Sequence, residues 1–324
     1  MQWMELSLHT TDEAIDWVRT LLATIDFTGE MGLAPYQPEQ NQPEQNQPEQ
    51  SAHSNQPWAY TLRLALPYDS QTMTRAEVIH RLLSPLERTG LTTALEMEMV
   101  DQQPVYTTTA IHPIGDRFVV LPPHYPYEVT SNQILLRLEP TLAFGSGLHP
   151  ATVLSLRLLE RHVTPTMSTL DLGCGSGILS VAMAKLGAQV LALDNDPTAV
   201  QATHQAVQLN DMEAKITVTQ GSLAGGSNLG HWMGGTLLDT GTTLNPVDCF
   251  DLIVANILGR IHIALASDYR QAIRQAETGS GLLITAGFTT DQEQEVAEAL
   301  TKAGFTVIDC ERLGEWVALT LQLT

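Results

Sequence analysis

The segment from Leu170 to Leu179, which reads LDLGCGSGIL, constrains the fold of this chain more than any other feature. It places three glycines where a predicted strand ends and a predicted helix begins. Glycine lets the backbone turn sharply there and lets a ligand approach the chain closely. From Glu139 onward, segments with strand and helix periodicity alternate, and this alternation predicts a doubly wound, mostly parallel α/β sheet.

Seven strands are expected in this part of the chain. They cover residues 169–172, 189–193, 215–219, 251–255, 281–286, 305–311 and 316–323, the last two as a hairpin at the edge. Helices are expected at 148–161, 178–186, 197–209, 258–276 and 291–303. The stretch 221–247 is rich in Gly and Thr and lacks clear periodicity, which indicates a surface insertion.

The glycine spacing distinguishes between two kinds of nucleotide-binding loop. Gly173, Gly175 and Gly177 form G-x-G-x-G, whereas a dinucleotide fingerprint has its third glycine where this chain has Ile178. Asp171 also precedes the turn. This pattern is typical of S-adenosylmethionine-dependent methyltransferases and disfavours a nicotinamide oxidoreductase. The acid suits a ligand that carries a cationic sulfonium and an amino group.

A second acid, Asp194, ends the next predicted strand. A carboxylate at that position can accept hydrogen bonds from both hydroxyls of a ribose. The alternative is that Asp194 only caps the following helix. Asp196 suits that cap better, because Pro197 then takes the first helical position. Asp194 is therefore predicted to bind the cofactor.

Asn256 follows the fourth strand, at the edge of the sheet where ligands bind in open α/β folds. Its side-chain carbonyl can accept a hydrogen bond from an amine and so aim the nitrogen lone pair at a methyl group. We therefore predict a catalytic role, with an N-cap of the next helix as the alternative. His149 enters another helix after a glycine turn; no His or Cys stands at metal-ligand spacing, and no metal site is expected.

Residues 1–100 show a different pattern, with expected strands at 3–8, 27–33, 58–66 and 92–100 and helices at 12–25 and 74–88. The order β-α-β-β-α-β predicts a small ferredoxin-like α+β domain. The low-complexity repeat QPEQNQPEQNQPEQ interrupts it, so 37–56 is interpreted as a surface loop. Residues 101–138 are rich in proline and are interpreted as a linker, with short strands at 117–121 and 134–138.

The charge balance argues against some partners. The chain has 16 Lys and Arg against 36 Asp and Glu, a formal charge of −20. Direct binding to DNA is disfavoured, because affinity for phosphate backbones comes from basic side chains; a basic partner is favoured. No apolar run approaches the ~20 residues of a membrane helix, and no signal peptide is expected at the N-terminus. Three widely spaced cysteines favour a reducing, cytoplasmic setting.

Five segments together resemble a known family. They are EPTLAFGSGLHP (139–150), the loop from Asp171 to Leu179, DNDP (194–197), ANIL (255–258) and GEWVAL (314–319). In these segments the chain is similar to the bacterial methyltransferases that modify ribosomal protein L11, the PrmA family of class I S-adenosylmethionine-dependent enzymes.

The resemblance implies cofactor contacts at Thr152, Gly173, Asp194 and Asn256. It also implies that domain 1–100 grips a ribosomal protein while domain 139–324 methylates a lysine or α-amino nitrogen of it. We expect a basic substrate and a monomeric enzyme.

Two other functions remain open on the sequence. One is a related methyltransferase that acts on another protein or on a small amine. The other is a homologue that binds the cofactor without turnover. A nucleic-acid amino-methyltransferase is disfavoured, because its fourth strand is expected to lead into Asn-Pro-Pro-Tyr, whereas this chain has Asn256-Ile257-Leu258.

Overall fold

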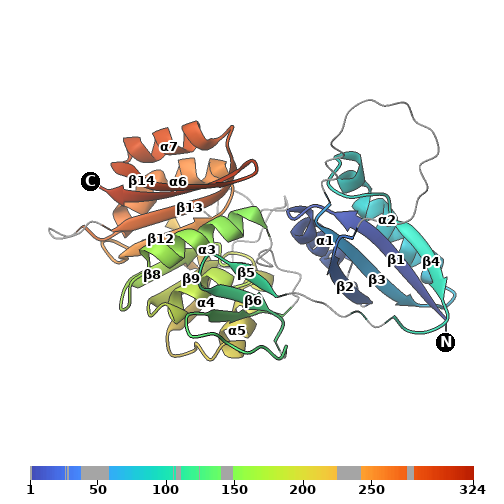
Figure 1. Cartoon of the computed structure of the whole chain (residues 1–324). Coiled ribbons are helices and arrows are strands. Elements are labelled where there is room, and N and C mark those ends of the chain that lie inside the picture. Colours follow the sequence, from blue (N-terminus) through green and yellow to red (C-terminus); the bar gives the residue numbers. More distant parts are fainter. Residues whose placement is uncertain are drawn as a thin grey trace, which may run out of the picture. The chain divides into compact units, whose positions relative to one another are not determined.

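The computed structural model separates the chain into two compact units, Met1–Ala110 and Ile111–Thr324 (Figure 1). The structure describes residues 2–25, 27, 29–37, 58–104, 106, 111–123, 125–139, 149–224, 242–275 and 281–324. Most of the predicted loop 37–56, of the segment 139–150 and of the insertion 221–247 lies outside these residues. Among the described residues, no helix is long and apolar enough to cross a membrane.

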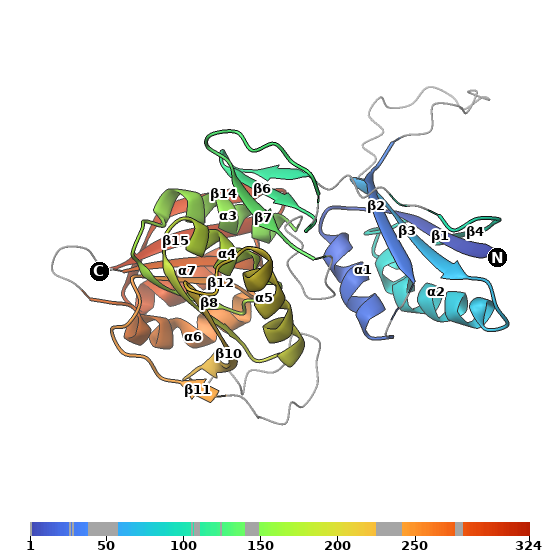
Figure 2. The ribbon, with the colours of Figure 1, turned by 90° about the horizontal axis from the view of Figure 1, so that it is seen from below.

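The first unit is an antiparallel sheet with two helices on one face (Figures 1 and 2). Alternation in β1 explains the layer, because Met4, Leu6 and Leu8 are buried while the residues between them are only partly covered. The strand order β2-β3-β1-β4 is the ferredoxin-like topology that the sequence predicts. The elements are β1 (Trp3–Thr10), α1 (Ala14–Ala23), β2 (Glu30–Pro35), β3 (Tyr60–Pro67), α2 (Thr72–Arg88) and β4 (Glu96–Val100).

Most of the predicted linker 101–138 is a folded part of the second unit, which corrects its boundary. Three strands, β5 (His112–Ile114), β6 (Phe118–Leu121) and β7 (Ile134–Arg137), form a small sheet of their own. All four residues of β6 are buried, and Phe118 and Val120 join the same core as helices of the second unit. The short strands predicted at 117–121 and 134–138 are confirmed as β6 and β7, but they belong to the folded second unit rather than to a linker, because this apolar run is buried in its core.

The main sheet of the second unit has eight strands in the order β11-β10-β9-β8-β12-β13-β15-β14. The strands are β8 (Ser168–Leu172), β9 (Gln189–Asp194), β10 (Ile216–Leu223), β11 (Thr242–Leu244), β12 (Leu252–Asn256), β13 (Leu282–Thr289), β14 (Phe305–Leu313) and β15 (Trp316–Leu323). All run in the same direction except β15, which is antiparallel to its neighbours β13 and β14, so the sheet is mostly parallel and ends in a hairpin, as predicted. Seven strands were expected; the eighth, β11, lies inside the predicted insertion and pairs with the end of β10.

Helices cover both faces of this sheet (Figures 1 and 2). The strand β12 shows why, since Leu252 and Val254 point into one core while Ile253 and Ala255 point into the other. Helices α3 (Pro150–His162), α4 (Ile178–Lys185) and α5 (Pro197–Leu209) pack in the first core. Helices α6 (Gly259–Ala272) and α7 (Glu293–Lys302) pack in the second, which completes the doubly wound architecture.

The chain reverses its winding between β8 and β12, which are sequence-distant neighbours in the centre of the sheet. Ligands of open α/β sheets bind at such a switch point, beyond the carboxyl ends of the strands. Three predicted residues, Gly173, Asp194 and Asn256, lie at the carboxyl ends of β8, β9 and β12. The topology therefore brings them to the same edge.

Candidate active site

The glycine loop between β8 and α4 is tightly enclosed. Gly173, Gly175 and Gly177 have φ values of 75°, 53° and 81°, a left-handed conformation that favours glycine. A Cβ on Gly177 would lie 3.0 Å from the Cα of Thr203 in α5. The Gly173 amide donates to the Leu193 carbonyl at 2.8 Å, so the loop is fastened to the end of β9. The glycines are thus needed for this close approach of loop, strand and helix.

The Asp194 side chain ties the glycine loop to the next turn. One carboxylate oxygen accepts from the Gly175 amide at 3.0 Å, and the other accepts from the Asp196 amide at 3.0 Å. Each carboxylate oxygen can accept more than one hydrogen bond. Asp196 caps α5 by accepting from the Thr198 amide at 2.8 Å, which confirms the predicted cap. Asp194 therefore does not cap the helix, and its carboxylate lies at the half-buried end of β9.

Asp171, which precedes the glycine loop, is buried and not exposed to solvent. Its side chain is fully buried, and one carboxyl oxygen accepts from the Ser180 hydroxyl at 2.5 Å. The other oxygen is buried without a hydrogen-bond partner. Burial raises the pKa of Asp171 to about 7; the Ser180 hydrogen bond opposes this rise, and the charge of Asp194 adds to it. Asp171 can therefore act on a ligand at the glycine loop through its charge, but it offers no exposed oxygen for a hydrogen bond.

Asn256 presents an acceptor with no partner. Its amide nitrogen donates to the Thr152 hydroxyl of α3 at 3.2 Å, while its side-chain oxygen is buried and makes no hydrogen bond to any described residue. The N-cap of α6 is Leu258, so Asn256 is not a helix cap. A buried acceptor without a donor is costly unless a ligand supplies one. This arrangement suits an N–H group that arrives from outside the protein.

His149 has a structural role. Its Nδ1 accepts from the Ala151 amide at 3.1 Å and caps α3, and its ring stacks edge-on against Trp316 with centroids 4.4 Å apart. The cap accounts for His149, which is almost completely buried. In the described part of the chain, no group of His, Cys, Asp and Glu is arranged to hold a metal ion.

Sequence reasoning missed the support beneath Asn256. The Ala286 carbonyl accepts from the Ile257 amide at 3.0 Å and lies 2.9 Å from Nε2 of His262, whose Nδ1 is 3.2 Å from the Tyr269 hydroxyl. Burial lowers the pKa of His262 to about 4, so the ring is neutral at pH 7. His262 and Tyr269 share the buried face of α6 at helical spacing, which is the signal that could have revealed them.

Ile257 itself packs between two glycines. A Cβ on Gly173 would lie 2.6 Å from the Ile257 side chain, and a Cβ on Gly287 would lie 2.5 Å from the Ile257 carbonyl oxygen. Gly287 also has a φ of 91°, which disfavours any other residue there. The turn that carries Asn256 is therefore held in place from both neighbouring strands.

The match with known proteins covers nearly the whole chain. The family model described as ribosomal protein L11 methyltransferase (PrmA) matches residues 2–324. This chain belongs to the ribosomal protein L11 methyltransferase family. Ribosomal protein L11 methyltransferase of Chloroflexus aurantiacus is 37% identical over 98% of this chain and 97% of its own length. The Herpetosiphon aurantiacus protein of the same name is 36% identical over 99% of this chain and 98% of its own.

A solved member of the L11 methyltransferase family shares the fold. The crystal structure of ribosomal protein L11 methylase from Lactobacillus delbrueckii subsp. bulgaricus superimposes with a TM-score of 0.54 at 28% identity. The match covers 66% of this chain and 99% of that chain. These comparisons confirm the resemblance that the sequence motifs indicate.

The motifs that indicate the L11 methyltransferase family meet at one edge of the sheet. The glycine loop, the turn after Asp194 and the turn after Asn256 lie at neighbouring strand ends. The segment 314–319 joins them, since Trp316 stacks on His149 at the start of α3. In segment 139–150 the structure describes only Glu139, His149 and Pro150.

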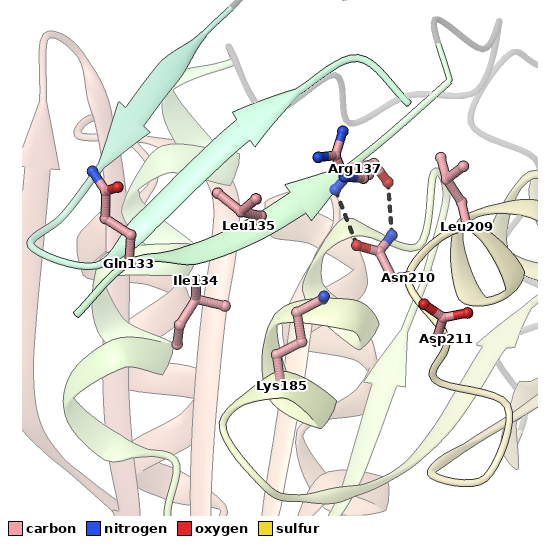
Figure 3. A pocket seen from close by; sticks show the side chains of 8 residues that line it. All are labelled: Gln133, Ile134, Leu135, Arg137, Lys185, Leu209, Asn210 and Asp211. Atoms are coloured by element: carbon pink, nitrogen blue, oxygen red, sulfur yellow. Dashed lines mark hydrogen bonds between the residues drawn. The ribbon is translucent and has the colours of Figure 1, made fainter. Parts of the chain in front are cut away.

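A separate pocket of about 390 Å³ lies at the C-terminal ends of helices α4 and α5, away from the glycine loop (Figure 3). There the Asn210 side chain accepts from the Arg137 amide at 3.0 Å and donates to the Arg137 carbonyl at 2.7 Å. These bonds fasten β7 to the end of α5. The lining contains no predicted site residue; it consists of Gln133, Ile134, Leu135, Arg137, Lys185, Leu209, Asn210 and Asp211.

Proposed function

We propose that this chain transfers a methyl group from S-adenosylmethionine to a lysine or α-amino nitrogen of ribosomal protein L11. The observation that carries the proposal is the side-chain oxygen of Asn256. It is a buried hydrogen-bond acceptor with no partner, at the sheet edge where the glycine loop and Asp194 also lie. Membership of the L11 methyltransferase family supports the choice of substrate.

The residues at this edge fit S-adenosylmethionine by their chemistry. Gly173, Gly175 and Gly177 leave no side chain over the loop, so a ligand can approach its backbone. A carboxylate oxygen can accept more than one hydrogen bond, so the Asp194 carboxylate suits the ribose hydroxyls of this cofactor by its chemistry. When bound, this cofactor supplies an electrophilic methyl group on a cationic sulfonium. The negative charge of Asp194, and that of Asp171 when ionised, favours such a cation.

Asn256 and Thr152 are proposed to orient the nucleophile and the cofactor. The Thr152 hydroxyl fixes the amide nitrogen of Asn256, which leaves the side-chain oxygen as the free acceptor. An amine that donates an N–H to this oxygen has its lone pair turned away from it, toward the methyl group. Asn256 carries no charge, so it does not stabilise the ammonium form, and only the neutral amine can attack.

The first unit is proposed to recognise the substrate, and the second to hold the cofactor. Residues 1–110 contain 15 Asp and Glu against five Arg, so this unit attracts a basic protein. The proposal treats the chain as a monomer that acts in the cytoplasm, where ribosomal proteins are made. Its cysteines Cys174, Cys249 and Cys310 are free thiols, which is compatible with a reducing compartment.

Labelled S-adenosylmethionine and L11 that has never been methylated provide the test. The expected result is label on L11, mapped by mass spectrometry to a lysine or to the α-amino group. Label on a different ribosomal protein or on a small amine, and not on L11, would identify that molecule as the substrate. Cofactor binding without any transfer would identify a homologue that lacks turnover.

A further inference from the structure

Among the described residues of the first unit, the strand β4 is an edge of the sheet. It pairs there with β1 alone and ends the strand order β2-β3-β1-β4. Its residues Glu96 to Met99 are all exposed, and among them Met97 and Met99 are 43% and 44% exposed. An exposed edge strand presents unpaired backbone N–H and C=O groups that another strand can join.

The two faces of β4 differ in chemistry. In the register with β1, Met97 lies opposite Leu6 and Met99 opposite Met4, so both methionines share the helix-covered face. Glu98 lies opposite Glu5 on the other face. A segment that extends the sheet beyond β4 therefore meets methionine side chains on one face and glutamates on the other.

The acidic face is incompletely neutralised. Like charges directly opposite each other destabilise an antiparallel pair, yet the register places Glu98 against Glu5. Arg63 of β3 reaches Glu5 at 3.4 Å, but no ion pair is formed by Glu96 or Glu98 among the described residues. Arg63 and the Tyr106 hydroxyl, which donates to Glu5 at 3.1 Å, relieve part of this repulsion at Glu5. Glu96 and Glu98 remain as negative charges that a cationic partner can neutralise.

A second copy of this chain does not suit the edge. In the antiparallel register that pairs all of β4 with a second β4, Glu98 lies opposite itself, and this register adds further repulsion. A strand with Lys or Arg at alternate positions has the opposite effect.

We propose that β4 accepts an extended, positively charged segment of the protein substrate as a fifth strand of this sheet. Basic side chains of that segment lie opposite Glu96 and Glu98, and apolar side chains lie beside Met97 and Met99. The backbone bonds supply affinity, and the alternation of side chains supplies selectivity. This inference rests on the proposed function, because it takes the methylated protein as the bound partner.

The first test reverses charge on the edge of the full-length chain. The double variant Glu96→Lys/Glu98→Lys relieves the repulsion with Glu5, so it is expected to fold. Its KM for unmethylated L11 is expected to rise roughly tenfold, with kcat nearly unchanged. Its KM for a short peptide that contains only the methylated residue should stay the same. The control Glu77→Lys/Glu87→Lys makes an equal charge change at exposed positions of α2.

Equal rises of KM in both double variants would show that overall charge, and not β4, attracts the substrate. An unchanged KM in the β4 variant would also overturn the proposal.

The second test measures hydrogen bonding of the β4 backbone amides. Amide hydrogen exchange over residues 96–100 is compared for the wild-type chain with and without L11. Strand addition is expected to slow the exchange of those β4 amides that β1 leaves unpaired, while docking through side chains alone leaves them fast. Methylation of L11 without this protection overturns strand addition and leaves the proposed function intact. Failure of the wild type to methylate L11 overturns both.

Discussion

At the scale of single residues, the buried carboxyl of Asp171 is expected to reduce stability. Its folded-state pKa of about 7 lies above its ordinary value of 3.8. The folded state therefore retains a proton that the unfolded chain has lost, and stability falls as pH rises from about 4 to about 7. Above that range the full cost of burying the charge is present.

Replacing Asp171 by Asn removes this cost and preserves the shape. Asp171→Asn is expected to stabilise the cofactor-free chain by a few kcal/mol at pH 8, at ~1.4 kcal/mol per pKa unit, and by less at pH 5. Denaturant unfolding at both pH values measures the difference. Asp116→Asn changes an exposed carboxyl and serves as the control. A gain that is equal at the two pH values would contradict the raised pKa.

The open acceptor of Asn256 gives a kinetic prediction. Asn256→Ala is expected to lower kcat about 100-fold and to change cofactor affinity much less, because the hydrogen bond to the amine matters mainly in the transition state. Single-turnover transfer to L11, with cofactor affinity measured by calorimetry, separates the two effects. Asn256→Asp keeps the shape but stabilises an ammonium, so raising the pH should restore part of its rate. Wild-type transfer by saturated Asn256→Ala would exclude the catalytic role.

The sequence predicts which residues lie together at the candidate site, but it does not predict which side chains surround them. Gly173, Asp194 and Asn256 each follow an apolar strand, and parallel strands direct such residues to one edge. The depth of Asp171 was not predictable, since it depends on how α4 covers β8. The same holds for His262, because contact with the Ala286 carbonyl depends on packing between α6 and β13.

At the scale of elements, Asn210 joins the small sheet to α5. Besides its two bonds to Arg137, it donates to the Ala206 carbonyl at 2.8 Å within its own helix. Asn210→Ala removes this partner from the partly buried N–H and carbonyl of Arg137 and from the buried Ala206 carbonyl, so the free energy of unfolding should fall by about 1–3 kcal/mol. Denaturant unfolding measures the loss, and the exposed Gln208→Ala on the same helix is the control.

Methyl transfer by folded Asn210→Ala is expected to remain near the wild-type rate, because α4 and α5 separate Asn210 from the glycine loop. An Asn210→Ala variant with wild-type stability would contradict the stabilising role of the hydrogen bonds between β7 and the end of α5.

The elements that periodicity predicts are the ones with long apolar patterns. Strands such as β9 and β12 alternate between two cores, so they appear in the sequence as nearly continuous apolar runs. The short strands behave differently. β11 has only three residues and pairs only with β10, so no local signal distinguishes it from a loop. The sequence predicts β6 and β7 as short strands but not the three-residue β5, and it assigns all three to a linker because prolines surround them.

At the scale of the whole molecule, acidic residues outnumber basic ones more strongly in the first unit than in the second. The first unit contains 15 acids against five arginines, although the candidate site residues all lie in the second. The proposed attraction of a basic protein substrate accounts for this acidic excess outside the candidate site. Solubility alone would not require four glutamates, Glu5, Glu30, Glu96 and Glu98, on strands of one small sheet.

Salt should therefore weaken recognition of the protein substrate while chemistry is preserved. Raising the salt concentration from 0.1 M to 1 M shortens the Debye length from ~10 Å to ~3 Å. KM for L11 is expected to rise at least tenfold over this range, because many exposed charges contribute to the encounter. Steady-state assays at saturating S-adenosylmethionine measure it, and a short uncharged peptide around the target amine serves as the control substrate. The rise should be smaller in Glu96→Lys/Glu98→Lys, since two of the attracting charges are gone. A KM for L11 that is insensitive to salt would mean that apolar contacts, such as those offered by Met97 and Met99, dominate recognition.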